Sequence, residues 1–337
     1  MNRSLLFVCA IAHVVLMGMS AYAGEIVLSR DAETGWNVYT LRQGSTEVRV
    51  VPEKGCNAYS VKVDGVEYFR QPERLADLGG HGNPLLYPTP NRIKGARFMF
   101  GGKEYKFPPN SRGNFIHGLV RAAPWQAESF DPEGDYVSLT CAIRFERGTE
   151  WFELFPFTHS LRMTITVREA SVRWTYEVDN TGDKPIPFGF ACHPWFVYHG
   201  ERAQSFLHVP ATHLMESIRE LPTGNLLGLP GHPLDATQPR SLSGFVADHV
   251  YYGMQPDKPA SIDFRVARRR VIFRASEEFT HLVVYTPEQP YLCIENQTCS
   301  TDAHNLYERG LKKESHLQVC PVGKKRSGFV EYRFESY

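Results

Sequence analysis

Apolar and polar residues alternate with a period of two along most of this chain. The alternation is strictest in residues 161–167 and 172–178, and an Asn-Thr-Gly-Asp cluster at residues 180–183 follows the second run. Successive side chains of a β-strand point to opposite faces, so this pattern predicts two strands, a turn and a third strand. The third strand begins near Ile186. We expect its ladder to stop at His193, because the following proline has no backbone donor, and this would leave the imidazole where a sheet opens to solvent.

Two-residue turn signals separate further pairs of strand candidates. Asp64-Gly65 lies between residues 59–63 and 66–69, and Gly101-Gly102 lies between residues 97–100 and 104–107. Such dipeptides tolerate the positive φ angles of a tight hairpin. The remaining strand candidates are residues 136–145, 152–157, 205–209, 261–264, 271–274, 281–286 and 328–334.

The same pattern also indicates the fold class. Outside the N-terminal segment, no 12-residue window has a clean apolar period of 3.6 residues. Many short strands broken by Gly and Pro predict an all-β protein, built as a large antiparallel β-sandwich. Residues 221–239, which are rich in Pro and Gly, are interpreted as a long surface loop, because strand patterns continue beyond them. We therefore expect a single domain over residues 24–337.

Residues 1–23 have the pattern of a signal peptide of the Sec type. Arg3 is followed by the apolar residues 5–19 and by Ala21-Tyr22-Ala23, a small-x-small cleavage site. We expect export to a periplasm or to the medium, with a mature chain that starts at Gly24. An uncleaved anchor is the alternative, but about 15 apolar residues are short for a membrane span. No later apolar run approaches 18 residues, so no membrane association is expected after cleavage.

Charge and cysteine content narrow the partners and the redox chemistry. Lys and Arg number 37, as do Asp and Glu, so the formal net charge is zero and nothing predicts nucleic-acid binding. Cys9 leaves with the signal peptide. Disulfides are compatible with export, but small buried side chains are the preferred interpretation for the other six, and their connectivity cannot be deduced. These are Cys56, Cys141, Cys192, Cys293, Cys299 and Cys320.

Groups suited to proton transfer lie beside several of the strand-like segments. Asn91-Arg92-Ile93 and residues 114–118 contribute Arg92 and His117, and residues 293–298 contribute Glu295. With His193 they provide two histidines, an arginine and a carboxylate.

In this order the segments resemble the aldose 1-epimerase (galactose mutarotase) family. The resemblance runs from about residue 41 to the C-terminus, and five short motifs in the family's order form a strong signal. It implies a galactose mutarotase-like supersandwich with a sugar site on the concave face of one sheet. The matching segments are Pro90-Asn91-Arg92-Ile93, residues 114–118, residues 189–196, Asp248-His249-Val250-Tyr251 and residues 294–298.

The resemblance implies that the α and β anomers of a free hexose, such as glucose or galactose, are interconverted by ring opening and closure. Opening takes a proton from the anomeric hydroxyl and gives one to the ring oxygen, which a carboxylate and an imidazolium on opposite sides of the sugar would do. Glu295 is the candidate base and His193 the candidate acid. Apolar neighbours at residues 291–294 are expected to raise the pKa of Glu295. Activity should fall at low pH as Glu295 gains a proton and at high pH as His193 loses one. No cofactor and no metal are expected.

The candidate substrate-binding residues surround this pair. His117 matches the family's second histidine. Arg92 would donate to sugar hydroxyls and also orient Glu295, whereas Asp248 would accept from hydroxyls, with a turn aspartate as the alternative. Asn91 and Gln297 complete the set. Two positions depart from the family pattern, Trp195 in place of tyrosine and Asn296 in place of proline.

Other functions remain alternatives at this stage. A non-catalytic carbohydrate-binding sandwich would keep the binding residues without needing both proton-transfer groups. A hexose 6-phosphate epimerase would need an additional cationic cluster, and a glycosidase would usually need two carboxylates. The sequence leaves open the preferred sugar, a free sugar or a reducing end, and the oligomeric state.

Overall fold

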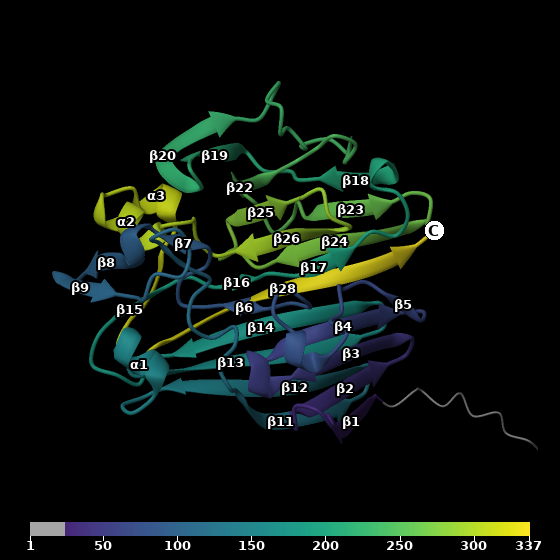
Figure 1. The fold of residues 1–337 in the computed structure, drawn as a ribbon, viewed down its shortest axis with the longest axis horizontal. Helices are drawn as coiled ribbons and strands as arrows, with labels where there is room; N and C mark the ends of the chain where they lie inside the picture. The colour runs from purple at the N-terminus through teal and green to yellow at the C-terminus, as the bar shows by residue number, and fades with distance from the viewer. Residues whose placement is uncertain (1–23) are drawn as a thin grey trace, which may run out of the picture.

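The computed structural model describes residues 24–337, and the predicted signal peptide lies outside the described residues. Antiparallel sheets make up most of the fold (Figure 1). A five-stranded sheet contains β1 (Glu25–Arg30), β2 (Asn37–Gln43), β3 (Thr46–Val51), β4 (Asn57–Val63) and β5 (Val66–Glu67). A nine-stranded sheet contains, in spatial order, β11 (Gln126–Glu133), β12 (Tyr136–Phe145), β13 (His159–Arg168), β14 (Ser171–Asp179), β28 (Lys325–Ser336), β24 (Arg269–Ala275), β23 (Ala260–Phe264), β18 (Ser205–His208) and β21 (Arg240–Ser241).

An eight-stranded sheet carries the site described below. It contains β20 (Leu221–Gly228), β19 (His213–Ile218), β22 (Asp248–Tyr252), β25 (His281–Tyr285), β26 (Tyr291–Gln297), β16 (Ala191–Cys192) and β6 (Leu85–Leu86), and β17 (Trp195–Val197) also pairs with β26. Three ribbons join β7 (Arg92–Ile93) to β10 (Phe115–Ile116), β8 (Arg97–Phe100) to β9 (Lys103–Lys106), and β15 (Ile186–Phe188) to β27 (Gln318–Cys320). The helices are α1 (Glu150–Leu154), α2 (Ala303–Glu308) and α3 (Lys312–Ser315), with 3-10 turns η1 (Pro52–Lys54), η2 (Leu75–Asp77), η3 (Lys94–Ala96) and η4 (Arg202–Gln204).

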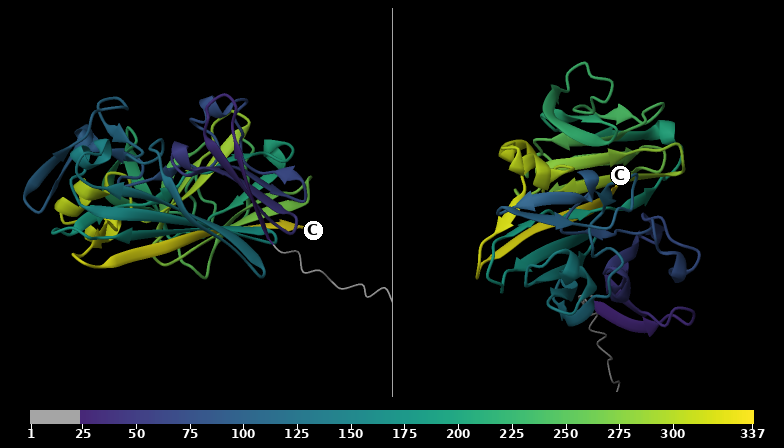
Figure 2. Two further views of the ribbon diagram at one scale, coloured as in Figure 1. Left: turned by 90° about the horizontal axis from the view of Figure 1, so that it is seen from below. Right: turned by 60° about the vertical axis from the view of Figure 1, so that its left-hand side comes forward.

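The nine-stranded sheet forms the base of the sandwich and buries one of its faces. Along β13, buried residues alternate strictly with partly exposed ones. The five-stranded sheet covers one part of this face, and the eight-stranded sheet covers another. In the left view of Figure 2 the purple strands β1–β5 stand above the long sheet. On the other part, Phe196 of β17 packs against Phe273 of β24 and Tyr332 of β28, with ring centroids 5.5 and 5.7 Å apart. Burying one such side chain stabilises the fold by about 1.5–3 kcal/mol.

The structure confirms the all-β prediction and most of the predicted strands. Residues 161–167 and 172–178 lie within β13 and β14, and Asp64 and Gly65 both have the positive φ angles expected of the hairpin turn, 52° and 75°. Three predictions were wrong. The single strand expected from Ile186 to His193 is interrupted, because β15 ends at Phe188 in a two-stranded ribbon and β16 begins at Ala191 in the eight-stranded sheet. Residues 152–157 are not a strand, because the chain forms α1 there, and the first part of the expected loop 221–239 is the strand β20.

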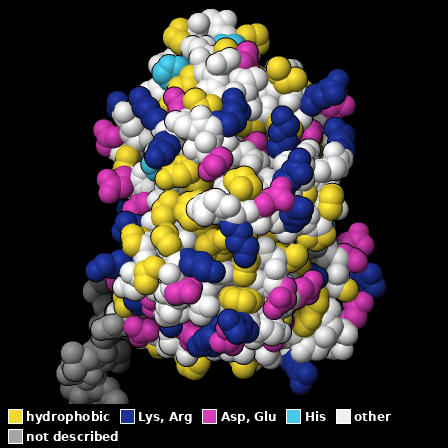
Figure 3. Space-filling model, turned by 90° about the vertical axis from the view of Figure 1, so that its left-hand side faces the viewer, with side chains coloured by type: hydrophobic (Ala, Val, Ile, Leu, Met, Phe, Trp, Pro, Cys, Tyr) yellow, Lys and Arg dark blue, Asp and Glu magenta, His cyan; other side chains and the backbone are white. Residues whose placement is uncertain are grey.

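Cysteines and surface charge agree with the sequence analysis. All six cysteines within residues 24–337 are free and buried, as expected for small core side chains. Figure 3 shows one face of the molecule, on which basic, acidic and apolar side chains are intermixed. Within the same residues, no helix has the length and apolar character needed to cross a membrane.

Candidate active site

The register of the eight-stranded sheet gathers side chains from four strands on one face. Leu292 and Ile294 of β26 belong to the sandwich core, so Cys293 and Glu295 point to the opposite face. Residues directly paired across antiparallel strands share a face. The pairs Asp248–Tyr285, Tyr285–Cys293 and Cys293–Trp195 therefore form one row across β22, β25, β26 and β17, beside the pair Val283–Glu295.

His193 lies in the gap between β16 and β17. Its N–H donates to the carbonyl of Pro84 at 3.0 Å, and the strand pairing with β26 resumes at Trp195. The ladder thus stops at His193 as predicted. The imidazole is not open to solvent, however, because the residue is only 7% exposed. Its ring stacks on the indole of Trp195, with centroids 5.0 Å apart and an interplanar angle of 15°.

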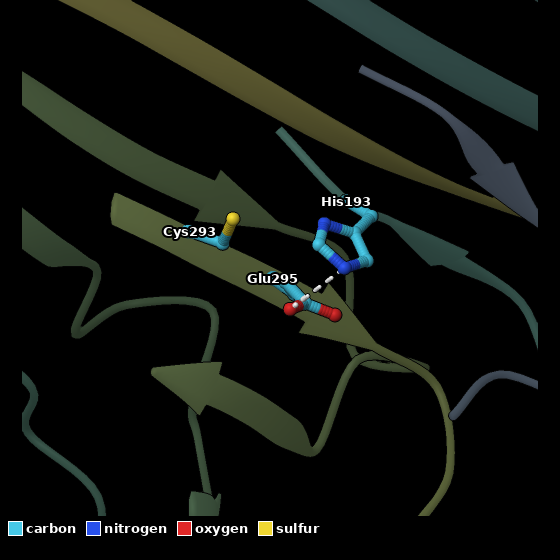
Figure 4. Close-up of side chains that lie close together, drawn as sticks. All are labelled: His193, Cys293 and Glu295. Carbon is cyan, nitrogen blue, oxygen red and sulfur yellow. Dashed lines mark ion pairs between the residues drawn. The ribbon is translucent and has the colours of Figure 1, made fainter. Parts of the chain in front are cut away.

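The candidate acid and base are direct neighbours. His193 Nε2 lies 3.4 Å from Glu295 Oε1, with both side chains on the same side of β26 (Figure 4). The expectation that the two groups face each other across a sugar was therefore wrong. Adjacent groups can still serve ring opening, because the anomeric hydroxyl and the ring oxygen are bonded to the same carbon.

Gln297 supports Glu295 from the same strand face. Its side-chain amide donates to Glu295 Oε2 at 3.2 Å. Gln297 is fully buried and does not line the cavity, so its expected role as a sugar contact was wrong. Its position is that of a residue that orients the carboxylate and stabilises its charge.

The β7–β10 ribbon brings two of the predicted motifs together. Arg92 pairs with Ile116, and the N–H of His117 donates to the carbonyl of Asn91 at 2.9 Å. The His117 ring then meets the His193 ring edge to face, with centroids 5.0 Å apart. The next residue, Gly118, must be glycine, because a Cβ there would lie 2.3 Å from the carbonyl oxygen of Tyr87.

Arg92 does not hold the Glu295 carboxylate, contrary to expectation. Its guanidinium donates to Asn91 Oδ1 at 3.1 Å and forms an ion pair of 2.9 Å with Glu220. Glu220 is the charged residue at this site that the sequence analysis missed. It belongs to the tip of the β19–β20 hairpin, and no motif or strand pattern around it indicates a position near Arg92.

These residues enclose one cavity of about 290 Å³. Of the seven predicted site residues, six line it and Gln297 does not. The lining consists of Asn91, Arg92, Ile116, His117, His193, Trp195, Glu220, Asp248, Val283, Tyr285 and Glu295.

Burial controls the protonation of the His193–Glu295 pair. Burial raises the pKa of Glu295 well above its usual value, and the charge of Asp248 adds to this effect. Burial also lowers the pKa of His193 to about 4 and lowers the pKa of His117 well below its usual value. Between the raised pKa of Glu295 and the lowered pKa of His193, the free pair therefore shares a single proton, which rests on Glu295. This differs from the expected carboxylate and imidazolium, because burial disfavours the charged form of each group.

A metal ion would find three donor atoms here. The ligand atoms of His193, Cys293 and Glu295 lie within 4.8 Å of one another. Burial raises the pKa of the Cys293 thiol well above its usual value, so a thiolate ligand would have to form against that burial. Ring opening by proton transfer does not require such an ion, and metal independence stays a prediction.

Comparison with known proteins assigns the chain to a family. The sequence model described as aldose 1-epimerase matches residues 37–328, which include all five motifs named above. The chain belongs to the aldose 1-epimerase family. This confirms the resemblance inferred from the motifs.

Solved structures of the family have the same fold. A galactose mutarotase-like protein from Clostridium acetobutylicum superposes with a TM-score of 0.85 at 20% identity, covering 94% of this chain and 99% of that chain. A galactose 1-epimerase from Lactobacillus acidophilus gives a TM-score of 0.75 at 15% identity, covering 93% and 98%. At these identities the likeness shows the fold, and the predicted mutarotase-like sandwich is confirmed.

Curated relatives align over shorter segments. The protein named Uncharacterized protein YphB, from Escherichia coli K12, is 30% identical over 168 residues, which is 47% of this chain and 51% of the relative. Uncharacterized protein YihR of the same strain is 24% identical over 182 residues, covering 52% and 55%. The aligned segments thus span about half the length of these relatives.

Proposed function

We propose that this chain is an aldose 1-epimerase that interconverts the α and β anomers of free hexoses such as glucose or galactose without a cofactor. The observation that carries the proposal is the 3.4 Å contact between His193 Nε2 and Glu295 Oε1 inside a cavity that also presents Arg92 and Asp248. One proton acceptor and one proton donor side by side match the two oxygens of a single acetal carbon.

The proposed step moves two protons and breaks one bond. Glu295 takes the proton of the anomeric hydroxyl, the bond between C1 and the ring oxygen breaks, and His193 gives its proton to that oxygen. Rotation about C1–C2 and the reverse transfers give the other anomer. These proton transfers require that the proton shared by the pair lies on His193 and that Glu295 is ionised. Hydrogen bonds from the anomeric hydroxyl to Glu295 and from His193 to the ring oxygen favour that charged form once the sugar is bound.

The surrounding residues suit a sugar in this position. Arg92 and Asn91 provide donors and Asp248 provides acceptors for ring hydroxyls. Trp195 and Tyr285 also line the cavity and offer aromatic surface to the C–H groups of a pyranose. The cavity of about 290 Å³ is of the order expected for a small-molecule site.

Polarimetry tests the proposal directly. Purified residues 24–337 should accelerate the change in optical rotation of fresh α-D-glucose or α-D-galactose. Glu295→Gln and His193→Asn should each lower kcat by about 10²–10⁴-fold. His213→Asn, on β19 outside the cavity, serves as the matched control and should keep the wild-type rate. Wild-type rates from both active-site variants would refute the assignment.

Two alternatives give different results in the same assay. A carbohydrate-binding protein would bind sugars without accelerating mutarotation. A hexose 6-phosphate epimerase would prefer the phosphorylated sugar. The lining of the cavity argues against the second alternative, because Arg92 is its only Lys or Arg among the described residues and already pairs with Glu220.

We also propose that residues 1–23 direct export. The motivating pattern is the apolar segment followed by Ala21-Tyr22-Ala23. Intact mass of the protein recovered from the exported fraction should correspond to a chain that starts at Gly24. Recovery of the full-length chain in the cytoplasm alone would contradict the proposal.

A further inference from the structure

The β19–β20 hairpin ends in a turn with an unusual sequence. Ile218 pairs with Leu221, so Arg219 and Glu220 are the only two residues of the loop. Both have positive φ angles, 51° and 66°. Tight hairpin turns of this kind strongly favour Asn and Gly, because most other residues are unfavourable in the left-handed conformation. Interactions elsewhere must hold this turn in place, and the side chain of Glu220 provides one of them.

Glu220 reaches from this tip to the arginine of the cavity. Its carboxylate lies 2.9 Å from Arg92 Nη2 and 3.8 Å from Arg112 Nη1. The side chain of Arg92 is 14% exposed and that of Glu220 is 34% exposed, whereas that of Arg112 is 84% exposed. The Arg92 contact is thus the sheltered one, and it lies in the wall of the candidate sugar site.

Among the described residues that line the cavity, no Lys or Arg side chain is unpaired. Arg92 is the only Lys or Arg among the described lining residues, and Glu220 and Asp248 flank it with two carboxylates. Burial raises the pKa of Asp248, the Arg92 charge opposes that rise, and the Glu220 charge adds to it, so the three groups interact. A negatively charged ligand would therefore meet two carboxylates and an arginine that is already neutralised.

We propose that Glu220 is a specificity-determining residue, whose carboxylate pairs with Arg92 and so prevents this arginine from binding anionic groups. The site therefore accepts uncharged aldoses and rejects aldoses that carry a carboxylate or a phosphate. The proposal rests on the proposed function in that it takes the cavity to be the sugar site. Replacing Glu220 by an uncharged residue would free the guanidinium, whose fork of donors matches carboxylate and phosphate oxygens.

Calorimetric binding measurements test this without depending on turnover. D-glucose and D-glucuronate are the probes, because they differ only in the group at C6. Wild-type protein should bind glucose at least tenfold more tightly than glucuronate. Glu220→Gln should reduce that ratio at least tenfold, mainly through tighter glucuronate binding, and Glu220→Asp should keep a ratio close to wild type because it keeps the charge.

Glu216→Gln is the matched control on the same hairpin. The Glu216 carboxylate accepts hydrogen bonds from Thr223 and Asn225 and does not line the cavity, so its loss should leave the affinity ratio within twofold of wild type. A change in that ratio as large as that of Glu220→Gln would trace the effect to the hairpin rather than to the charge on Arg92, and would overturn the proposal.

The remaining outcomes separate this proposal from the proposed function. Three outcomes would overturn the role of Glu220 alone. The affinity ratio could be unchanged in Glu220→Gln, that variant could lose affinity for both sugars equally, or wild type could bind glucuronate as tightly as glucose. A shifted ratio without any acceleration of mutarotation would support Glu220 and overturn the enzyme. Failure of wild type and of every variant to bind either sugar would overturn both the role of Glu220 and the proposed function.

Discussion

The side-chain amide of Gln297 donates a hydrogen bond of 3.2 Å to the carboxylate of Glu295, two residues away on the same face of β26. This contact stabilises the ionised form and so opposes the rise in pKa that burial imposes on Glu295. The site thereby keeps a buried carboxylate that can still give and take a proton. The protonation of the Glu295–His193 pair has consequences that can be measured.

The first prediction concerns the pH dependence of the wild-type rate. Because the pKa of Glu295 is raised and that of His193 is lowered to about 4, the pair holds one proton across the range between them. Activity should fall below about pH 4, where His193 takes a second proton, and at high pH, where Glu295 loses the only one. The sequence also predicts a bell-shaped pH–rate profile. It assigns the acid limb to Glu295 and the alkaline limb to His193, however, and the structure reverses this assignment.

Polarimetric rates over a wide pH series give the two apparent pKa values, which belong to the pair rather than to either residue. The Glu295→Gln variant should lose the alkaline limb while its residual activity keeps an acid limb. An alkaline limb that survives in this variant at an unchanged pH would contradict the assignment.

The second prediction concerns Gln297. Gln297→Leu removes a donor to the Glu295 carboxylate, so the pKa of Glu295 should rise further and the alkaline limb should move to higher pH. We expect kcat to fall by roughly tenfold, equivalent to about 1.4 kcal/mol, because the carboxylate also loses its fixed orientation. Full pH–rate profiles of wild type and variant provide the measurement. A lower rate with unmoved limbs would show that Gln297 acts on packing alone.

The third prediction separates backbone strain from close contact beside His117. Gly118→Ala would place a methyl group 2.3 Å from the carbonyl oxygen of Tyr87, at a φ of 64°. Gly113→Ala has a similar positive φ of 80° but open space around its Cβ. Gly113→Ala should cost about 1–2 kcal/mol of stability, because its side chain would be in the left-handed conformation, and should leave activity intact. Gly118→Ala should cost more and lower activity by displacing His117. Urea unfolding and polarimetry of both variants make the comparison, and equal effects would argue against the close contact.

The fourth prediction concerns stability in acid. His159 is buried and neutral. Its Nδ1 lies 2.7 Å from the carbonyl of Phe157, its Nε2 lies 2.7 Å from the hydroxyl of Tyr87, and burial lowers its pKa to about 4. Below about pH 6.5 the unfolded chain binds a proton at this residue that the folded chain does not. Stability is therefore present above that pH and is lost as the pH falls toward 4, by about 3 kcal/mol for this one group.

Urea unfolding midpoints at pH 7, 5.5 and 4.5 provide the measurement. His281 and His304 are also buried, with pKa values lowered to about 3 and about 4, and should add to the same loss. The His159→Gln variant should be less stable at pH 7 but should lose less stability between pH 7 and 4.5 than wild type. The same loss in both proteins would exclude His159 as a source.

Local patterns predicted elements well where one face of a strand is buried and the other is not. β13 and β14 carry the clearest alternation because each covers the core on a single side. Residues 152–157 were wrongly predicted as a strand, because a short apolar run does not distinguish a strand from a turn of helix. The helix α1 forms there instead. Pro222 and Gly224 weakened the strand signal of β20. This strand is at an edge of its sheet, where such residues are tolerated.

The sequence by itself determined the family and six of the residues that line the site, because each motif is a contiguous segment whose residue types carry the chemistry. Only the tertiary structure decided how these groups face one another. The antiparallel registers set His193 against Glu295 and buried both, which reassigned the shared proton. The tip of a distant hairpin placed Glu220 on Arg92, and Gln297 does not line the cavity but contacts Glu295. Strand registers and hairpin tips are fixed by packing across the whole sandwich, and no local pattern records them.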